Sequence, residues 1–268
     1  MLYTKKTFDY EYDISDAQVV FLGIPWDSTE TGKSVKYGSL FIREALRNLP
    51  GYDPENKFNP FAELKFCDLG DLEVVPGSWE MTKERIQDTI KEVFATNKNV
   101  FPIFLGGDHL ITLGILESLP YEKITVIDFD AHRDLMKEYL GNPYVHITWA
   151  HHIINNPKFE LVQIGARSWS EEEDDLISKL KDTFDNIDNP IYITVDMDVF
   201  DPGFAPEVGT PEPNGMKPAD FFEILEKVCK NNIIGMDIAE CASLEVGTPT
   251  AVLAAQIIRK VLLYKFHE

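Results

Sequence analysis

Metal-binding residue types gather at the ends of three apolar segments. The three clusters are Gly106-Gly107-Asp108-His109, Asp128-Phe129-Asp130-Ala131-His132-Arg133-Asp134 and Asp196-Met197-Asp198. In an extended chain, residues i and i+2 point to the same side, so an Asp-x-Asp or Asp-x-His pair can approach one ion together. This spacing predicts shared coordination of metal ions.

Charge supports the same interpretation. Four or five carboxylates that converge at one place repel each other strongly unless cations bind between them. Imidazole and carboxylate ligands together suit Mn²⁺, Fe²⁺ or Zn²⁺, and the dominance of oxygen and the absence of cysteine favour Mn²⁺. An isolated Asp-x-Asp is usually a loop or a helix cap, but three clusters after three apolar runs favour a metal site.

The elements that must position these clusters are short strands that alternate with helices. We expect strands at Val19–Ile24, Lys65–Leu69, Val100–Leu105, Ile124–Phe129, Leu161–Ile164, Ile191–Val195 and Ile233–Ile238. We expect helices at Leu40–Leu49, Thr82–Thr96, His109–Leu119, Trp169–Lys181, Ala219–Lys230 and Thr248–Tyr264. This alternation predicts a parallel sheet covered on both faces. A TIM barrel also fits, and both folds place their chemistry at the carboxyl ends of strands.

Composition narrows the class of protein. No linker divides the 268 residues, so we expect a single domain over residues 1–268. The 45 acidic and 25 basic residues give a net charge of −20, which argues against nucleic acids and anionic membranes as partners and favours a cationic ligand. The apolar runs are too short to span a membrane and the N-terminus lacks a signal-peptide stretch, which predicts a cytoplasmic protein. The three cysteines have no paired spacing and are expected to be reduced.

At these clusters the chain resembles the ureohydrolase family, which includes arginase and agmatinase. The resemblance covers nearly the whole sequence. It also includes Gly23-Ile24-Pro25-Trp26-Asp27, Asp196-Met197-Asp198-Val199-Phe200-Asp201-Pro202, Gly209-Thr210-Pro211-Glu212-Pro213 and Met236-Asp237-Ile238-Ala239-Glu240. The family fold that this implies is an α/β, three-layer αβα sandwich with a mainly parallel central sheet, as in arginases and deacetylases.

The resemblance also implies the ligands of two Mn²⁺ ions per chain. One ion would be held by His109, Asp130, Asp134 and Asp196, and the other by Asp130, His132, Asp196 and Asp198. Asp130 and Asp196 would bridge the two ions. Asp108 and Asp128 are not ligands in the family pattern, and we expect them to accept hydrogen bonds or to cap helices.

Two further residues match catalytic positions of the family. Glu240 would pair with the guanidinium group of the substrate, because a carboxylate can accept two N–H groups of that planar fork. His146 would move protons, since imidazole titrates near neutral pH. The alternatives are a strand-end carboxylate for Glu240 and a structural role for His146, whose neighbour Ile147 departs from the family's commoner His-Gly pair.

The implied reaction is hydrolysis of a cationic guanidinium compound with release of urea. We expect agmatine, converted to putrescine in polyamine biosynthesis, because Met136 stands where arginases carry an asparagine that holds the α-carboxylate of arginine. The acidic residues 171–173 could attract the second charge of agmatine, although a solvated helix start is the simpler interpretation. A different guanidinium compound could instead use Arg167.

Several alternatives stay open at this point. The enzyme could be an arginase or another guanidino or formimidoyl hydrolase of the same family. Metal-dependent deacetylases share the general fold, but they bind one metal through fewer carboxylates. A non-catalytic metal-containing binding protein is a further possibility, against which Glu240 and His146 argue. The resemblance also implies a homo-oligomer, either a trimer or a hexamer.

Overall fold

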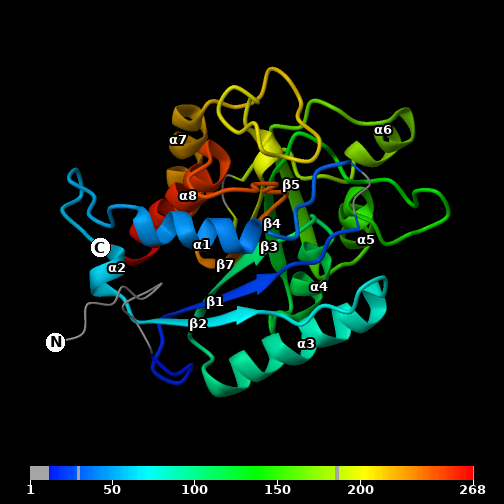
Figure 1. Cartoon of the computed structure of the whole chain (residues 1–268). Helices are drawn as coiled ribbons and strands as arrows, with labels where there is room; N and C mark the ends of the chain where they lie inside the picture. Colours follow the sequence, from blue (N-terminus) through cyan, green and yellow to red (C-terminus); the bar gives the residue numbers. More distant parts are fainter. Residues whose placement is uncertain (1–11, 29–30, 185–186, 268) are drawn as a thin grey trace.

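Parallel strands form the centre of the molecule. In the part of the chain that the computed structural model describes (residues 12–28, 31–184 and 187–267), seven strands form one sheet in the order β2-β1-β3-β7-β6-β4-β5 (Figure 1). The strands are β1 (Val19–Ile24), β2 (Phe66–Asp71), β3 (Phe101–Gly106), β4 (Ile124–Phe129), β5 (Phe159–Ile164), β6 (Ile191–Asp196) and β7 (Ile233–Ala239). All the pairings are parallel, and β2 and β5 lie at open edges, which excludes a closed barrel.

Helices cover both faces of the sheet. On one face lie α1 (Gly38–Asn48), α7 (Pro218–Cys229) and α8 (Pro249–Phe266), and on the other lie α3 (Trp79–Thr96), α4 (Ile111–Ser118) and α5 (Trp149–Ile154) (Figure 1). The shorter elements are α2 (Pro60–Glu63), α6 (Glu171–Ile177) and the 3₁₀ turns η1 (His146–Thr148) and η2 (Met197–Val199). The predicted αβα sandwich is therefore confirmed. Among the described residues, none of the helices combines the length and apolar character needed to cross a bilayer.

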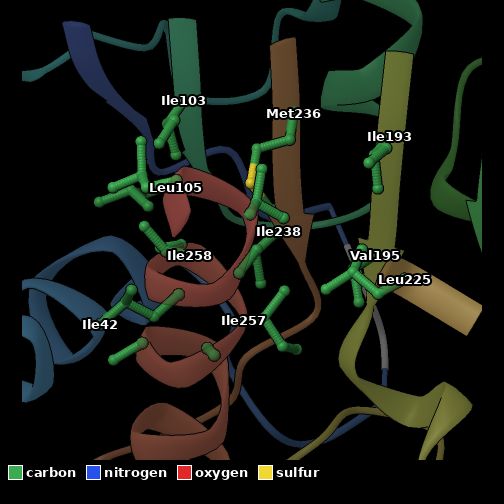
Figure 2. Packing of buried hydrophobic residues seen from close by; sticks show 14 of the residues in the cluster. Ile42, Ile103, Leu105, Ile193, Val195, Leu225, Met236, Ile238, Ile257 and Ile258 are labelled. Carbon is green, nitrogen blue, oxygen red and sulfur yellow. The ribbon is translucent and has the colours of Figure 1, made fainter. Parts of the chain in front are cut away.

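Branched aliphatic side chains fill the layer between α8 and the sheet. Figure 2 shows Ile257 and Ile258 of α8 beside Leu105 of β3 and Ile238 of β7, and all four are fully buried. Burial of each such side chain contributes about 1.5–3 kcal/mol. At the start of α8, the Thr248 hydroxyl accepts a hydrogen bond from a backbone N–H of the first turn. The core thus fixes the strands whose ends carry the polar clusters.

The register of the sheet brings the clusters together. The four strands β3, β7, β6 and β4 are consecutive neighbours in its middle. Phe129 of β4 pairs with Val195 of β6, so the residues that follow this pair along the chain, Asp130 and Asp196, lie at the same level. The GGDH cluster follows β3, which borders β7 on the other side. The carboxyl edge of the central sheet is therefore where the sequence motifs meet.

Two predicted helices are shorter in the structure. The helix expected from His109 begins only at Ile111, and the two residues before it form a turn in which the N–H of His109 donates to the Glu240 carboxylate. The helix expected over Trp169–Lys181 begins at Glu171, after a capping box formed by Ser170 and Glu173, and ends at Ile177.

Candidate metal centre and substrate pocket

The His109 imidazole faces three carboxylates. Its Nδ1 atom lies 3.0 Å from Asp130 Oδ2, 3.3 Å from Asp196 Oδ2 and 3.4 Å from Asp134 Oδ2. Nδ1 and Asp130 Oδ2 are both buried, and neither makes a hydrogen bond. Two metal bonds of about 2.1 Å at right angles place their ligand atoms about 3 Å apart. These four side chains therefore fit a shared cation better than a hydrogen-bonded cluster.

A second group forms around His132, which is only partly buried. Its Nδ1 atom lies 3.1 Å from Asp198 Oδ2 and 3.6 Å from Asp130 Oδ1. The two oxygens of Asp130 thus face different histidines, Oδ2 toward His109 and Oδ1 toward His132. This is the arrangement that a carboxylate bridging two ions requires.

Local backbone geometry holds the carboxylates in place. Asp196 Oδ1 accepts a hydrogen bond from the N–H of Asp198 at 2.8 Å, and Asp130 Oδ1 accepts one from the N–H of His132 at 2.6 Å. Asp134 has a φ of 54°, a left-handed conformation that is strained for a residue with a side chain. The indole N–H of Trp149 donates to Asp134 Oδ2 at 2.9 Å. The carboxylates of Asp130, Asp134 and Asp196 are therefore oriented before any ion binds.

The electrostatics show how strongly this cluster attracts positive charge. Burial lowers the pKa of His109, but the surrounding carboxylates outweigh it and raise that pKa well above its ordinary value. Burial and the charge of Asp130 raise the pKa of Asp134 to about 7, and burial and neighbouring carboxylates raise that of Asp196. In the metal-free protein, protons on these groups offset the acidic charge, and a binding metal ion must displace them.

Asp128 lies closer to the centre than the sequence indicated. Two groups of three residues have potential ligand atoms within 4.8 Å of one another. The first group is His109, Asp128 and Asp130, and the second is Asp130, His132 and Asp198. However, Asp128 Oδ1 lies 3.9 Å from Nε2 of His109, whereas Asp134 and Asp196 approach Nδ1. Asp128 Oδ2 also accepts a hydrogen bond from Gln163. A metal ion bound to Nδ1 of His109 would lie on the side of Asp134 and Asp196, whereas Asp128 lies on the Nε2 side. The geometry therefore favours Asp134 and Asp196 as ligands over Asp128.

Asp108 behaves as expected for a residue that organises a turn. It accepts hydrogen bonds from the N–H and hydroxyl of Ser28 and from the N–H of Leu110. Burial raises its pKa to about 7 despite these bonds. Asp108 therefore ties the GGDH segment to the loop that follows β1.

Glu240 follows β7 and is 3% exposed. Its φ of 59° is left-handed, and its Oε1 accepts the N–H of His109 at 3.0 Å. Burial and the charges of Asp196, Asp108 and Asp198 raise its pKa well above the usual range. A Cβ at Gly209 would lie 3.1 Å from Oε2, so glycine at this position leaves room beside that oxygen. The site thus presents a carboxyl oxygen to an incoming cation, whose positive charge favours the ionised form of Glu240.

A pocket of about 380 Å³ opens beside the cluster. It is lined by Ser28, Thr31, Tyr139, Leu140, Asn142, Val145, His146, Ile147 and Thr210. Thr210 donates to Asp198 Oδ2 at 3.2 Å, which connects the pocket to the candidate ligands. Burial and the nearby charges of His109 and His132 lower the pKa of His146 to about 4, so its imidazole is neutral near neutral pH. The described residues that line the pocket include no lysine or arginine.

Two residues considered as substrate contacts have structural partners instead. The Arg167 guanidinium donates to five backbone carbonyls, those of Gly165, Asp198, Val199, Glu212 and Pro213. Glu173 accepts hydrogen bonds from Ser170 and from the N–H of Leu135. Arg167 therefore fixes the loop that carries Asp198, and Glu173 fixes the segment after Asp134.

Comparison with known proteins agrees with this geometry. The family model described as the arginase family matches residues 17–264. The chain belongs to the arginase family. It is 34% identical to an N(1)-aminopropylagmatine ureohydrolase of Thermococcus kodakarensis over 96% of this chain and 95% of that protein. It is also 34% identical to an agmatinase of Pyrococcus horikoshii over 98% of each chain.

A solved structure extends this family likeness to the fold. The agmatine ureohydrolase of Thermoplasma volcanium superposes with a TM-score of 0.84 at 31% identity, covering 99% of this chain and 95% of that one. The predicted family is confirmed, and metal-dependent deacetylases are excluded as the family of this chain. As an arginase-family protein with this cluster, the chain is a metal-dependent hydrolase of guanidino compounds.

Sequence reasoning missed several residues that support the site. Trp149 and Thr210 each donate a hydrogen bond to a candidate ligand. No local sequence pattern indicates Trp149, and the motif that contains Thr210 indicates the family but not this contact. Thr194 and Asp237 did leave a signal, because they are polar residues inside apolar strands and both are fully buried. A buried polar residue requires a hydrogen-bond partner, so these two positions indicate polar groups nearby.

Proposed function

We propose that this protein hydrolyses agmatine to putrescine and urea and that it requires two Mn²⁺ ions per chain. The observation that carries the proposal is the convergence of three carboxylate oxygens on an imidazole nitrogen without a hydrogen bond, in a chain of the arginase family. The dominance of oxygen ligands over nitrogen favours Mn²⁺.

Six side chains would hold the two ions. They are His109, Asp130, Asp134 and Asp196 for one ion, and Asp130, His132, Asp196 and Asp198 for the other. When bound, the ions lower the pKa of water, which supplies a nucleophile near neutral pH. The cradle fits this role because its oxygens already lie at ligand spacing.

The remaining groups of the site would bind and orient the substrate. Glu240 would accept two guanidinium N–H groups, with Gly209 leaving space beside Oε2. His146 lines the adjacent pocket with an uncharged imidazole, so it can accept a proton and pass it to the departing amine. The pocket itself would hold the alkyl tail.

The tail of the substrate is expected to carry an amine and no carboxylate. An arginine carboxylate would enter a pocket whose described lining offers hydroxyl and amide groups but no cation. Burying an anion with such partners is costly in a protein of charge −20. Agmatine avoids that cost.

A second candidate substrate is N(1)-aminopropylagmatine. It is favoured by the relative that carries this name and by the pocket's open mouth, where Leu140 is 83% exposed. Urea release from agmatine, N(1)-aminopropylagmatine and arginine, measured as kcat/KM with Mn²⁺ present, separates the three. We expect agmatine to exceed arginine by at least about tenfold. Arginine equal to agmatine would contradict the proposed substrate, and a higher value for N(1)-aminopropylagmatine would replace agmatine with the longer amine.

Other features stay predictions on the same basis. We propose that residues 1–268 form one catalytic domain and that the chain assembles as a homo-oligomer, a trimer or a hexamer. Its location in the cytoplasm and its place in polyamine biosynthesis are predictions that depend on the substrate.

A further inference from the structure

A fully buried carboxylate, Asp237, lies behind the candidate metal centre on β7. In the described part of the chain, its hydrogen-bond partners are three hydroxyl groups. Thr194 Oγ1 lies 2.7 Å from Oδ1, Tyr192 OH lies 2.8 Å from Oδ2, and Thr112 Oγ1 lies 3.2 Å from each oxygen. A buried carboxylate without such donors would be strongly destabilising, so this set is a built environment and not a chance contact.

The Asp237 carboxylate determines the direction in which the three hydroxyl groups donate their protons. An ionised carboxylate can only accept, whereas each hydroxyl has a single proton to donate. Burial raises the pKa of Asp237, while His109 and the three hydroxyl donors act against that shift. When Thr194 gives its proton to Asp237, its oxygen is left to accept from another donor.

The Thr112 hydroxyl also lies 3.3 Å from Thr194 Oγ1, but its single proton is directed to Asp237, so the donor to Thr194 is the imidazole of His109. Its Nε2 atom lies 2.9 Å from Thr194 Oγ1, on the opposite side of the ring from Nδ1. Because Thr194 then accepts, the proton of the neutral ring must reside on Nε2. The Nδ1 atom is left with a lone pair directed at Asp130, Asp134 and Asp196, which is the form that binds a cation.

We propose that Asp237 is a positioning residue that acts through Thr194 to hold His109 in the tautomer that binds metal. The proposal rests on the proposed metal centre and adds a group that touches neither ion nor substrate. The His132 site has no such relay in the described residues, since its Nε2 faces Glu212 Oε1 at 3.6 Å. Asp237 therefore acts on one of the two sites.

Substitution of Asp237 by asparagine reverses the relay. The amide group has the shape of the carboxylate, and in the orientation that places its nitrogen beside Thr194 it donates to Thr194, which then gives its proton to Nε2 of His109. The proton of the ring moves to Nδ1 and blocks the lone pair. Loss of such an outer partner typically lowers metal affinity about 10–100-fold.

The test is a titration of the full-length protein with Mn²⁺ alone, in which the free ion is followed by electron paramagnetic resonance. We expect two bound ions in the parent protein. In Asp237→Asn, one site should weaken about 10–100-fold while the other keeps its affinity. Thr194→Val should reproduce this loss, and Thr194→Ser, which keeps the hydroxyl, should restore parent affinity. The double variant Asp237→Asn/Thr194→Val should be no weaker than either single variant, because both break one chain.

Tyr192→Phe is the matched control. It also removes a buried hydroxyl donor from Asp237 but leaves the link to His109 intact, so its effect on Mn²⁺ affinity should be smaller than that of Asp237→Asn. Equal Mn²⁺ affinities of the parent, Asp237→Asn and Thr194→Val would overturn the relay while the metal centre stood. A parent protein that binds no Mn²⁺ would overturn the metal centre as well. If Asp237→Asn fails to fold, the Thr194 pair decides alone, and equal affinity of its Val and Ser forms overturns the proposal.

Discussion

Replacement of Glu240 by glutamine separates substrate capture from metal binding. The glutamine side chain has the size of glutamate, and its carbonyl oxygen can still accept the N–H of His109, as Oε1 does at 3.0 Å. The amide nitrogen then takes the place of Oε2, beside Gly209. A guanidinium group that approaches this atom meets a donor where the parent protein offers a charged acceptor.

The expected loss follows from that one exchange. A hydrogen bond to a charged group contributes about 1.5–3 kcal/mol, and one such bond is replaced by a contact between two donors. A loss of about 3 kcal/mol corresponds to roughly 100-fold in kcat/KM for agmatine. The metal content should not change, because Glu240 is outside the six proposed ligands.

The assay measures urea release over a range of agmatine concentrations, with elemental analysis of the same samples. Glu223→Gln, the same change at an exposed position of α7 that pairs with Lys227, is the control and should behave as the parent. Unchanged kcat/KM in Glu240→Gln, with two metals bound, would show that Glu240 does not bind the guanidinium group. Loss of the metals would instead show that Glu240 supports the cluster.

Three further predictions concern the cluster and the pocket. Asp196→Asn should keep the hydrogen bond that its side-chain oxygen accepts from the N–H of Asp198, but it should lose both metals and nearly all activity. Retention of two metals at parent activity would refute the bridging role. His146→Ala should lower kcat with little change in metal content, and added imidazole should restore part of the rate; a variant as fast as the parent removes His146 from the mechanism. The pKa of Asp134 is raised to about 7 and that of His109 lies well above its ordinary value, so the folded metal-free protein holds more protons than the unfolded chain. Its Tm should therefore fall as the pH rises from about 5.5 to 8.5, while the increase in Tm on adding Mn²⁺ should grow, and the opposite trends in thermal unfolding would contradict this assignment.

The fold was largely predictable because its signals are local. Strands such as β4 and β6 are rich in β-branched apolar residues and are buried at every position, and this pattern marks strands covered on both faces. The order of the strands could not be predicted in this way, because it depends on which face of the sheet each connecting helix crosses. The neighbours β3 and β7 are far apart in sequence, and only tertiary packing places them side by side.

The site was predictable to the extent that its residues lie in motifs. The ligand candidates stand at fixed spacings after strands, and the structure brings all six together. Partners that reach the site from elsewhere, such as Trp149, follow from packing and leave no motif. The left-handed backbone at Asp134 and Glu240 was also invisible, because neither residue is a glycine that would have announced it.

The most direct test of the central claim is the product balance of the Mn²⁺-loaded protein with agmatine. Protein stripped of metal by a chelator serves as the control, and urea and putrescine are measured in the same reaction. The proposed function predicts equal amounts of urea and putrescine, formed only after Mn²⁺ is restored. Urea at the same rate without metal, or no urea from a protein that holds two Mn²⁺ ions, would contradict it.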